Sequence, residues 1–247
     1  MAEVRKNNWG AQGVRKLTPK ERLPNCEVYI NQPVFSLAEL AKGGKKVADI
    51  GCGFGRFKPE VENAGGEWIG IEPFEGGAAT IIASAEDIPV PDGTFDVVFM
   101  NAVLEHVPDV KRCFEEVSRI LKKDGHFVGY VAFMEAFHEI SYSHLSFKAV
   151  EHYAQITGMK LEKISGGGAF GIDYHFNILF NPLPVLWMRK PIAWTIRSII
   201  KMKSWVAYAV LRFKRGLPAE QASYEADLYY KLDCMAMSNG FHFVIRK

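Results

Sequence analysis

An acidic residue and a glycine-rich loop follow an apolar segment near position 50. Residues 47–55 read Val-Ala-Asp-Ile-Gly-Cys-Gly-Phe-Gly, so Asp49 precedes glycines at every second position. Glycine allows a tight turn and lets a ligand lie against the backbone where a Cβ would block it. A carboxylate beside such a loop attracts an ammonium group and repels a pyrophosphate. The spacing therefore indicates a nucleotide-type ligand with a positive charge and no phosphate.

Two phosphate-binding loops are the alternatives, and neither fits. The dinucleotide fingerprint Gly-x-Gly-x-x-Gly needs its third glycine at position 56, but Arg56 is there and the glycine is Gly55. A P-loop needs Gly-Lys-Ser or Gly-Lys-Thr at its end, which does not follow here. A strand-to-helix turn that binds nothing also explains the loop when the loop is taken alone.

A second acid, Glu72, ends the next short apolar segment, 67–72. It lies about twenty residues past the loop, where a βαβ unit of doubly wound topology places a carboxylate on ribose hydroxyls. Two charge-assisted hydrogen bonds there would each contribute roughly 1.5–3 kcal/mol. The alternative, a solvated glutamate at a strand end, requires this spacing to be a coincidence.

The segments that follow alternate between strand and helix patterns. Residues 84–96 read Ser-Ala-Glu-Asp-Ile-Pro-Val-Pro-Asp-Gly-Thr-Phe-Asp, and the continuous apolar run at 97–101 is typical of a buried strand. Residues 104–109, Leu-Glu-His-Val-Pro-Asp, open a helix whose body, 110–122, has apolar residues at helical spacing. Another apolar strand follows at 127–133. This alternation predicts an α/β fold with a largely parallel sheet.

In order and spacing, the stretch 47–133 resembles class I S-adenosylmethionine-dependent methyltransferases of the type 11 group. Members share the glycine loop with segments similar to Ala-Glu-Asp-Leu-Pro-Phe-Pro-Asp-Gly-Ser-Phe-Asp and Leu-Glu-His-Val. The resemblance implies a Rossmann-like, doubly wound sheet of about seven strands, mostly parallel with an antiparallel last strand. It also implies S-adenosylmethionine as the cofactor, while leaving the acceptor of the methyl group open.

The same resemblance assigns cofactor-binding roles along the chain. The amino-acid end of the cofactor would be held by Asp49 and by the loop residues Gly51, Cys52, Gly53 and Gly55. Glu72 would bind the ribose hydroxyls, and the adenine would lie among Pro73, Phe74, Ala85 and Glu86. Ser84 stands where related enzymes often carry Asp, and the backbone carbonyl of Asn101 would meet the methionine amine.

Three histidines are candidates for a general base. Methyl transfer mainly requires alignment of nucleophile, methyl and sulfur, and a base adds about 10²–10⁴-fold when the nucleophile is a hydroxyl. His106 is the first candidate, because it follows the 97–101 strand; His138 and His144 lie in the region that usually lines the acceptor site. A pocket-wall or surface role is the alternative for each. The Glu-x-x-x-Glu-His-like metal cluster of some quinone O-methyltransferases lacks its first acid here, at Asn101, so no metal is expected.

A basic, tryptophan-containing insertion is expected before the last strand. Between residues 174 and 219 the chain has no Asp or Glu, but it has eight Lys or Arg and three Trp. A helix over 192–215 would place Ile192, Ile196, Ile199, Val206 and Val210 on one face, with most basic side chains opposite. Three interpretations stay open: a membrane-surface helix or a lid for a lipid-linked acceptor, a patch for an anionic glycan or nucleic acid, and a substrate-capping or dimer-forming helix.

Length and composition favour one domain. The chain has 247 residues and a net charge of +2, which gives no overall case for nucleic acid as a partner. We expect a cap segment at 1–44, a cofactor-binding core at 45–173, the insertion at 174–239 and a final strand at 240–247. Four scattered cysteines without a Cys-x-x-Cys pair, and a polar stretch at 1–13, favour a cytoplasmic protein, with peripheral membrane contact through 187–215 as an alternative.

These observations predict an S-adenosylmethionine-dependent O-methyltransferase that acts on a small molecule, a sugar or glycan precursor or a secondary metabolite. The first alternative is a membrane-associated enzyme with a lipid-linked or quinone acceptor. The second is a cofactor-binding relative without catalysis. Nucleic acid is disfavoured as a substrate, because residues 101–104 read Asn-Ala-Val-Leu where base-amine methyltransferases often keep Asn/Asp-Pro-Pro-Tyr. A homodimer is a further expected assembly.

Overall fold

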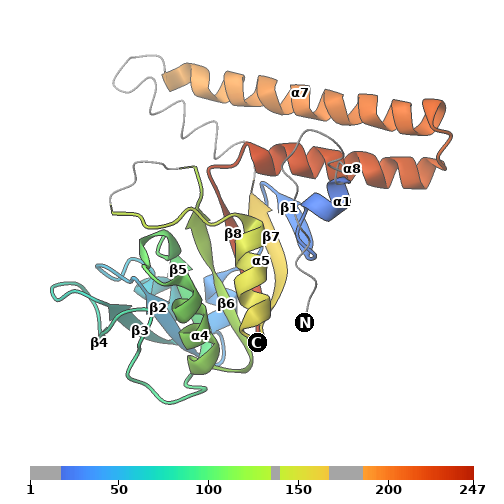
Figure 1. The fold of residues 1–247 in the computed structure, drawn as a ribbon. Coiled ribbons are helices and arrows are strands. Elements are labelled where there is room, and N and C mark those ends of the chain that lie inside the picture. Colours follow the sequence, from blue (N-terminus) through green and yellow to red (C-terminus); the bar gives the residue numbers. More distant parts are fainter. Residues whose placement is uncertain (1–17, 135–139, 167–185) are drawn as a thin grey trace.

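The fold is a mixed eight-stranded sheet covered by helices on both faces (Figure 1). The computed structural model describes residues 18–134, 140–166 and 186–247. The sheet order is β1-β7-β8-β6-β5-β2-β3-β4. The strands are β1 (Glu27–Ile30), β2 (Lys46–Ile50), β3 (Glu67–Glu72), β4 (Ile81–Ile82), β5 (Phe95–Asn101), β6 (Leu121–Ala132), β7 (Lys160–Gly166) and β8 (Gly240–Arg246).

Helices connect most of the strands. They are α1 (Pro19–Arg22), α2 (Leu37–Ala41), α3 (Lys58–Asn63), α4 (Val110–Ile120), α5 (Phe147–Ile156), α7 (Arg189–Ala209) and α8 (Ala219–Ala236). Two 3₁₀ turns, η1 (Leu104–His106) and η2 (Leu186–Met188), and a π turn, η3 (Val210–Lys214), complete the described elements. Side-chain caps mark several starts: Asp109 accepts from the Arg112 N–H, and Ser146 accepts from the Ala149 N–H.

The central strands are parallel because helical connections return the chain to the same edge of the sheet. β2 pairs in parallel with both β3 and β5, and β5 pairs in parallel with β6. β8 enters between β6 and β7 and runs antiparallel to both. This confirms the predicted Rossmann-like sheet with an antiparallel last strand. The carboxyl ends of β2, β3 and β5 therefore meet at one edge, where such folds bind ligands.

Apolar side chains form one layer on each face of the sheet. One layer lies with α4 and α5 and includes Phe114, Phe127 and Phe243, all fully buried. The other layer lies with α2 and α3 and includes Val61 and Trp68. Burial of both faces explains why β2 and β5 read as continuous apolar runs instead of alternating ones.

Two details of the sheet differ from the sequence prediction. The sheet has one strand more than the predicted seven, because β1, within the predicted 1–44 cap segment, pairs in parallel with β7. Its side chains are exposed or half-buried, so they lack the apolar signature of the central strands. The predicted 110–122 helix ends at Ile120, because the strand pairing of β6 begins at Leu121.

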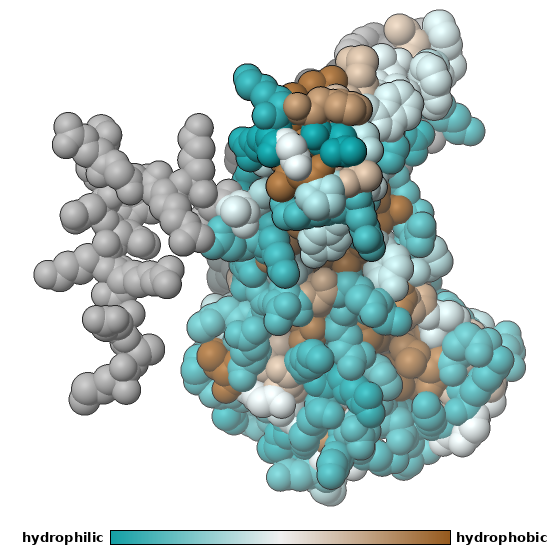
Figure 2. Space-filling view, turned by 90° about the vertical axis from the view of Figure 1, so that its right-hand side faces the viewer, coloured by the Kyte–Doolittle hydropathy of each residue, from teal (hydrophilic) through white to brown (hydrophobic). Residues whose placement is uncertain are grey.

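The predicted insertion contains a helical hairpin formed by α7 and α8. In Figure 1, α8 lies between α7 and the sheet, and Figure 2 shows the hairpin standing above the body of the molecule. β8 begins at Gly240, which pairs with Ala132, the last residue of β6. The hairpin therefore leads into the sheet at the same edge where β2, β3 and β5 end.

Candidate active site

A pocket of about 560 Å³ lies at the carboxyl edge of the sheet. Its wall comes from five stretches of chain, namely the end of β2, the end of β3, the 84–86 loop, the 102–108 segment and the 140–142 segment. The lining residues are Ile50, Gly51, Glu72, Pro73, Phe74, Ser84, Ala85, Glu86, Ala102, Val103, His106, Val107, Pro108, Ile140 and Tyr142. The structure thus brings most of the predicted ribose and adenine residues together with His106.

The glycine loop at 51–55 needs glycine for both conformation and space. Gly51, Gly53 and Gly55 have φ values of +72°, +49° and +72°, in the left-handed region. A Cβ on Gly51 would lie 2.4 Å from Cγ2 of Val103, on the segment that follows β5. The loop can therefore approach the β5 end closely only without a side chain. Cys52 is buried beside it, and burial raises the pKa of its thiol to about 11.

Glu72 joins the loop to the predicted ribose position. Its Oε2 accepts a hydrogen bond from the Gly53 N–H at 2.9 Å, and the residue also lines the pocket. The Ala78 N–H donates to the Gly53 carbonyl at 2.8 Å, so the segment after β3 is attached to the same loop. One carboxylate thereby fixes the glycine loop and faces the ligand space, as the predicted ribose-binding acid requires.

Asp49 lies beneath the loop and outside the set of pocket-lining residues. Its side chain is 2% exposed, and Oδ2 accepts a hydrogen bond from Nε1 of Trp68 at 3.0 Å. Burial raises the pKa of Asp49 to about 6, against the lowering effect of the Trp68 hydrogen bond. When a cation binds close to a buried carboxylate, it stabilises the ionised form that burial disfavours. This property suits an ammonium-bearing ligand. The sequence analysis did not identify Trp68, although β2 and β3 were both predicted.

The adenine-side loop is held by two side chains that the motif contains. The Ser84 hydroxyl donates to Oε2 of Glu86 at 2.7 Å, and Oε1 of Glu86 accepts from the Asp109 N–H at 2.8 Å. Glu86 therefore connects the 84–86 loop to the start of α4 while it lines the pocket. In this chain the serine hydroxyl, which can donate, orients Glu86 where a carboxylate at position 84 would repel it.

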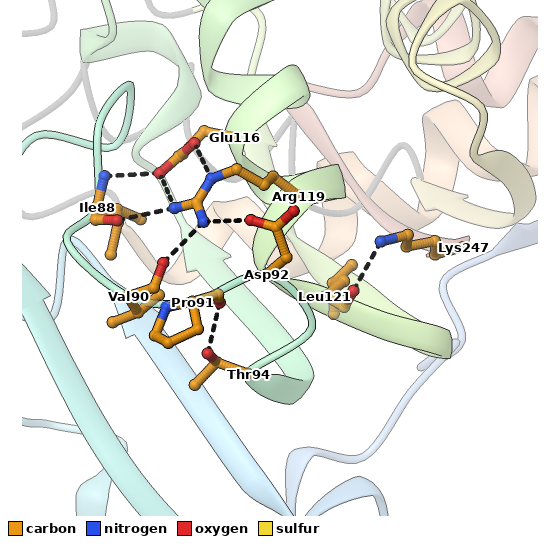
Figure 3. A network of polar contacts seen from close by, with 9 residues as sticks. All are labelled: Ile88, Val90, Pro91, Asp92, Thr94, Glu116, Arg119, Leu121 and Lys247. Atoms are coloured by element: carbon orange, nitrogen blue, oxygen red, sulfur yellow. Dashed lines mark hydrogen bonds and ion pairs between the residues drawn. The ribbon is translucent and has the colours of Figure 1, made fainter.

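Farther along the same loop, a charged pair on α4 binds the backbone (Figure 3). The Ile88 N–H donates to Oε1 of Glu116 at 2.7 Å, and Arg119 donates to both oxygens of Glu116. Arg119 also donates to the Ile88 and Val90 carbonyls and to Asp92. Burial alone would raise the pKa of Glu116, but the bonds from Arg119 and the Ile88 N–H hold it below its usual value. We call Glu116 and Arg119 the loop clamp.

His106 is oriented by the segment beyond β6. Its Nδ1 lies 2.8 Å from the carbonyl oxygen of Ile140, and because a carbonyl only accepts, Nδ1 carries the hydrogen of this bond. In the neutral imidazole the lone pair is then on Nε2. The Tyr142 N–H donates to the Glu105 carbonyl at 2.8 Å, which holds the same segment against η1. His144 is exposed and is not among the pocket-lining residues, and His138 lies outside the described residues.

A second cavity of about 380 Å³ lies next to the first, because Asn101 lines this one and Ala102 lines the other. Its walls include Phe35, Phe57 and His242. Burial lowers the pKa of His242, so its imidazole is neutral near pH 7. The sequence analysis missed His242, because only the antiparallel entry of β8 between β6 and β7 brings it to this edge. Among the described residues, no group of His, Cys, Asp or Glu is arranged to hold a metal ion.

Comparison with known proteins supports this interpretation of the pocket. A family model described as a methyltransferase domain matches residues 48–129, which include the glycine loop, Glu72, the 84–86 loop and His106. This match identifies a methyltransferase domain at residues 48–129. S-adenosylmethionine is its cofactor, and the buried acid, the glycine loop and Glu72 fit that cationic nucleoside.

Relatives of this methyltransferase domain include an uncharacterized methyltransferase from Mycobacterium sp. (strain JLS), 29% identical over 152 residues, which cover 56% of this chain and 60% of that protein. A ubiquinone/menaquinone biosynthesis C-methyltransferase from Rickettsia akari is 28% identical over 148 residues, covering 56% and 59%. The chain thus spans about three fifths of these relatives. A candidate sarcosine dimethylglycine methyltransferase from Galdieria sulphuraria shares the fold, with a TM-score of 0.53 and 14% identity over 85% of this chain and 81% of its own.

Proposed function

We propose that the chain is an S-adenosylmethionine-dependent O-methyltransferase that acts on the hydroxyl of a small molecule. The observation that carries this proposal is the orientation of His106 in the wall of the cofactor pocket. Its Nδ1–H is donated to the Ile140 carbonyl, so Nε2 is the nitrogen that can take a proton. An imidazole nitrogen at the pocket wall that can accept a proton suits a nucleophile that must lose one, as a hydroxyl does on methylation.

In this proposal, some pocket residues bind the cofactor and His106 transfers the proton. When bound, the cofactor supplies a methyl group on a sulfonium sulfur. Glu72 and the glycine loop would hold its ribose and amino-acid end, and the 84–86 loop would bind the adenine. His106 Nε2 would accept the acceptor's hydroxyl proton as the new O–CH₃ bond forms and the S–CH₃ bond breaks. The smaller cavity beside Asn101 offers an apolar wall for the rest of the acceptor.

A second candidate function is methylation at carbon. It is favoured by the Rickettsia akari relative, which is named as a C-methyltransferase of quinone biosynthesis. A phenolic acceptor would still use His106 to remove the hydroxyl proton, and the new C–CH₃ bond would form at a ring carbon as the S–CH₃ bond breaks. That carbon would then lose its own proton while the phenol oxygen is reprotonated. Incubation with cell extract and ¹³C-methyl-labelled cofactor, followed by mass spectrometry and NMR of the product, separates the two outcomes. A methyl carbon bonded to carbon would reject O-methylation.

The test of catalysis is release of S-adenosylhomocysteine that depends on added acceptor. Without such turnover, the chain would be a cofactor-binding relative. With an acceptor in hand, His106→Ala should lower kcat by about 10²–10³-fold while the Kd of the cofactor changes little. His144→Ala, an exposed histidine outside the pocket, is the matched control and should leave kcat unchanged. Small and equal losses in kcat and affinity for His106→Ala would show that the imidazole only shapes the wall.

A further inference from the structure

Only one side of α7 is covered by the rest of the described chain. Ala193, Ile200, Ser204 and, in the following π turn, Leu211 are buried, and they recur at helical spacing toward α8. The Ser204 hydroxyl donates to the Ala226 carbonyl at 3.0 Å, which joins the two helices. The sequence analysis had grouped Ile192, Ile196, Ile199, Val206 and Val210 on one apolar face. In the structure Ile199, Val206 and Val210 are exposed, because α8 packs on a different side of the helix.

The side of α7 that points away from α8 is apolar and exposed. Trp194 is 67% exposed, Met202 55%, Trp205 65% and Val206 59%. At about 100° per residue these four positions fall within one face of roughly 120°. Trp187 before the helix and Phe213 after it are also exposed. We call this set the outer face of α7. Figure 2 shows brown, apolar side chains near the top of the hairpin beside hydrophilic ones.

Basic residues border the outer face, and acidic residues are absent from this stretch of sequence. Lys190 and Lys201 project along one border and Lys203 along the other, and all three are exposed. The π turn adds Arg212 and Lys214, and no Asp or Glu occurs between residues 174 and 219. The acidic partners in the hairpin belong to α8, where Asp233 accepts from Nζ of Lys203 at 2.7 Å. The outer face is therefore apolar at its centre, with Lys190 and Lys201 along one border and Lys203, which is paired with Asp233, along the other.

We propose that the outer face of α7 docks on the surface of an anionic membrane. Tryptophan prefers the membrane–water interface, and lysine side chains can extend from a buried helix toward phosphate headgroups. A second copy of the chain fits the charge less well, because a two-fold contact would place the basic borders of the two copies against each other. Among the helices of the described residues, none is long and apolar enough to cross a bilayer, so α7 would lie in the plane of the surface.

The attachment of the hairpin orients the domain on such a surface. α8 lies between α7 and the sheet, so the outer face points away from the body of the molecule (Figure 1). Gly240 at the start of β8 pairs with Ala132 at the end of β6, at the sheet edge that holds the cofactor pocket. Docking through α7 would therefore turn this edge toward the bilayer. The proposed contact itself does not depend on the methyl-transfer reaction.

The experiment is co-sedimentation of the full chain with sucrose-loaded vesicles. Vesicles of phosphatidylcholine with about one third phosphatidylglycerol should bind at least tenfold more protein than phosphatidylcholine alone, since each basic side chain is attracted to an anionic surface. Binding should fall strongly at about 1 M salt, where the Debye length is roughly 3 Å. Brominated lipids should quench tryptophan emission, because Trp194 and Trp205 would enter the interface.

The double variant Trp194→Glu/Trp205→Glu should reduce binding to anionic vesicles at least tenfold. Tyr229→Glu, which places the same charge on an exposed aromatic position of α8, is the matched control and should bind as the parent does. Unchanged circular dichroism and cofactor affinity would show that both variants fold. No binding to anionic vesicles, or binding that the double variant retains, would overturn the proposal. A dimer in solution that the double variant dissociates would assign the face to a second copy instead.

Discussion

The cofactor-binding half of the molecule and the α7–α8 hairpin differ in how many elements their side-chain hydrogen bonds join. Around the pocket, such bonds join several strands, loops and a helix, as in the pairs Trp68–Asp49, Glu72–Gly53 and Glu116–Ile88. In the hairpin, side-chain contacts join α7 to α8, as in Ser204–Ala226 and Lys203–Asp233. The pocket geometry is thus determined by many elements together, whereas the outer face of α7 can change without disturbing it. Such separation suits a domain with a fixed cofactor and a variable partner or acceptor.

Among the variants considered, disruption of the loop clamp should cost the most folding stability. Arg119→Met removes the guanidinium partner of the Glu116 carboxylate, which is 2% exposed, and leaves its hydrogen bond from the Ile88 N–H in place. Loss of one partner of a buried pair costs about 3–5 kcal/mol, so we expect an unfolding free energy lower by roughly 3 kcal/mol. Because the clamp holds the 88–92 segment, cofactor affinity should also fall, by about tenfold. Urea unfolding and calorimetry measure the two effects.

Two exposed ion pairs provide the controls for the clamp. Lys111→Met removes a pair with Glu115 on the same helix, and Lys203→Met removes the pair with Asp233 in the hairpin. Exposed pairs contribute about 0–1 kcal/mol, so both variants should be nearly as stable as the parent and bind the cofactor equally well. If Lys203→Met lowered cofactor affinity as much as Arg119→Met does, the hairpin and the cofactor pocket would not be energetically independent.

A substitution in the glycine loop should lower cofactor affinity without involving the hairpin. Gly51→Ala combines a left-handed φ with a Cβ 2.4 Å from Val103, so cofactor affinity should fall about a hundredfold or the loop should shift. Gly65→Ala is the matched control, because Gly65 has a φ of +83° but no atom within 4 Å of the added Cβ. If Gly51→Ala and Gly65→Ala lose cofactor affinity equally, backbone strain explains the loss and the contact with Val103 does not. Recovery in Gly51→Ala/Val103→Ala would identify the contact with the β5 end as the cause.

The features that short local sequence patterns encode were predicted. The apolar segments of β2 and β5 and the glycine loop were predicted, and the resemblance implied a Rossmann-like sheet. Strand β1 was missed, because it is four residues long, lacks buried side chains and pairs with residues 163–166, far along the chain. Its stabilising partner is visible only in three dimensions.

The motif residues Glu72, 84–86 and His106 line one pocket. The cofactor contacts assigned to them stay predictions. The loop clamp was missed, because Glu116 and Arg119 on an amphipathic helix look like solvated charges, and only the fold of the 88–92 segment buries Glu116. His242 was missed because only the antiparallel entry of β8 between β6 and β7 brings it to this edge. The side of α7 that packs on α8 could not be predicted either, since apolar residues occur around most of the helix.

The smallest expected effect is a pH dependence that originates at Asp49. Its folded pKa of about 6 lies above the unfolded value, so ionisation is disfavoured in the free protein and stability falls as pH rises from about 4 to 6. A bound ammonium group favours the ionised form. The affinity for S-adenosylmethionine should therefore rise about three- to tenfold between pH 5 and 7.5, as measured by calorimetry.

Two controls isolate the Asp49 carboxylate. Adenosine carries no ammonium group, so its affinity should be nearly independent of pH over this range. Asp49→Asn keeps an acceptor for the Trp68 Nε1–H but cannot ionise, so the rise in cofactor affinity should disappear. The same variant should also lose the fall in stability, which we estimate at roughly 1–3 kcal/mol in the parent from one unit of pKa being about 1.4 kcal/mol. A cofactor affinity that still rises with pH in Asp49→Asn would place the titrating group elsewhere, and the buried acid would then serve only to hold Trp68 beneath the glycine loop.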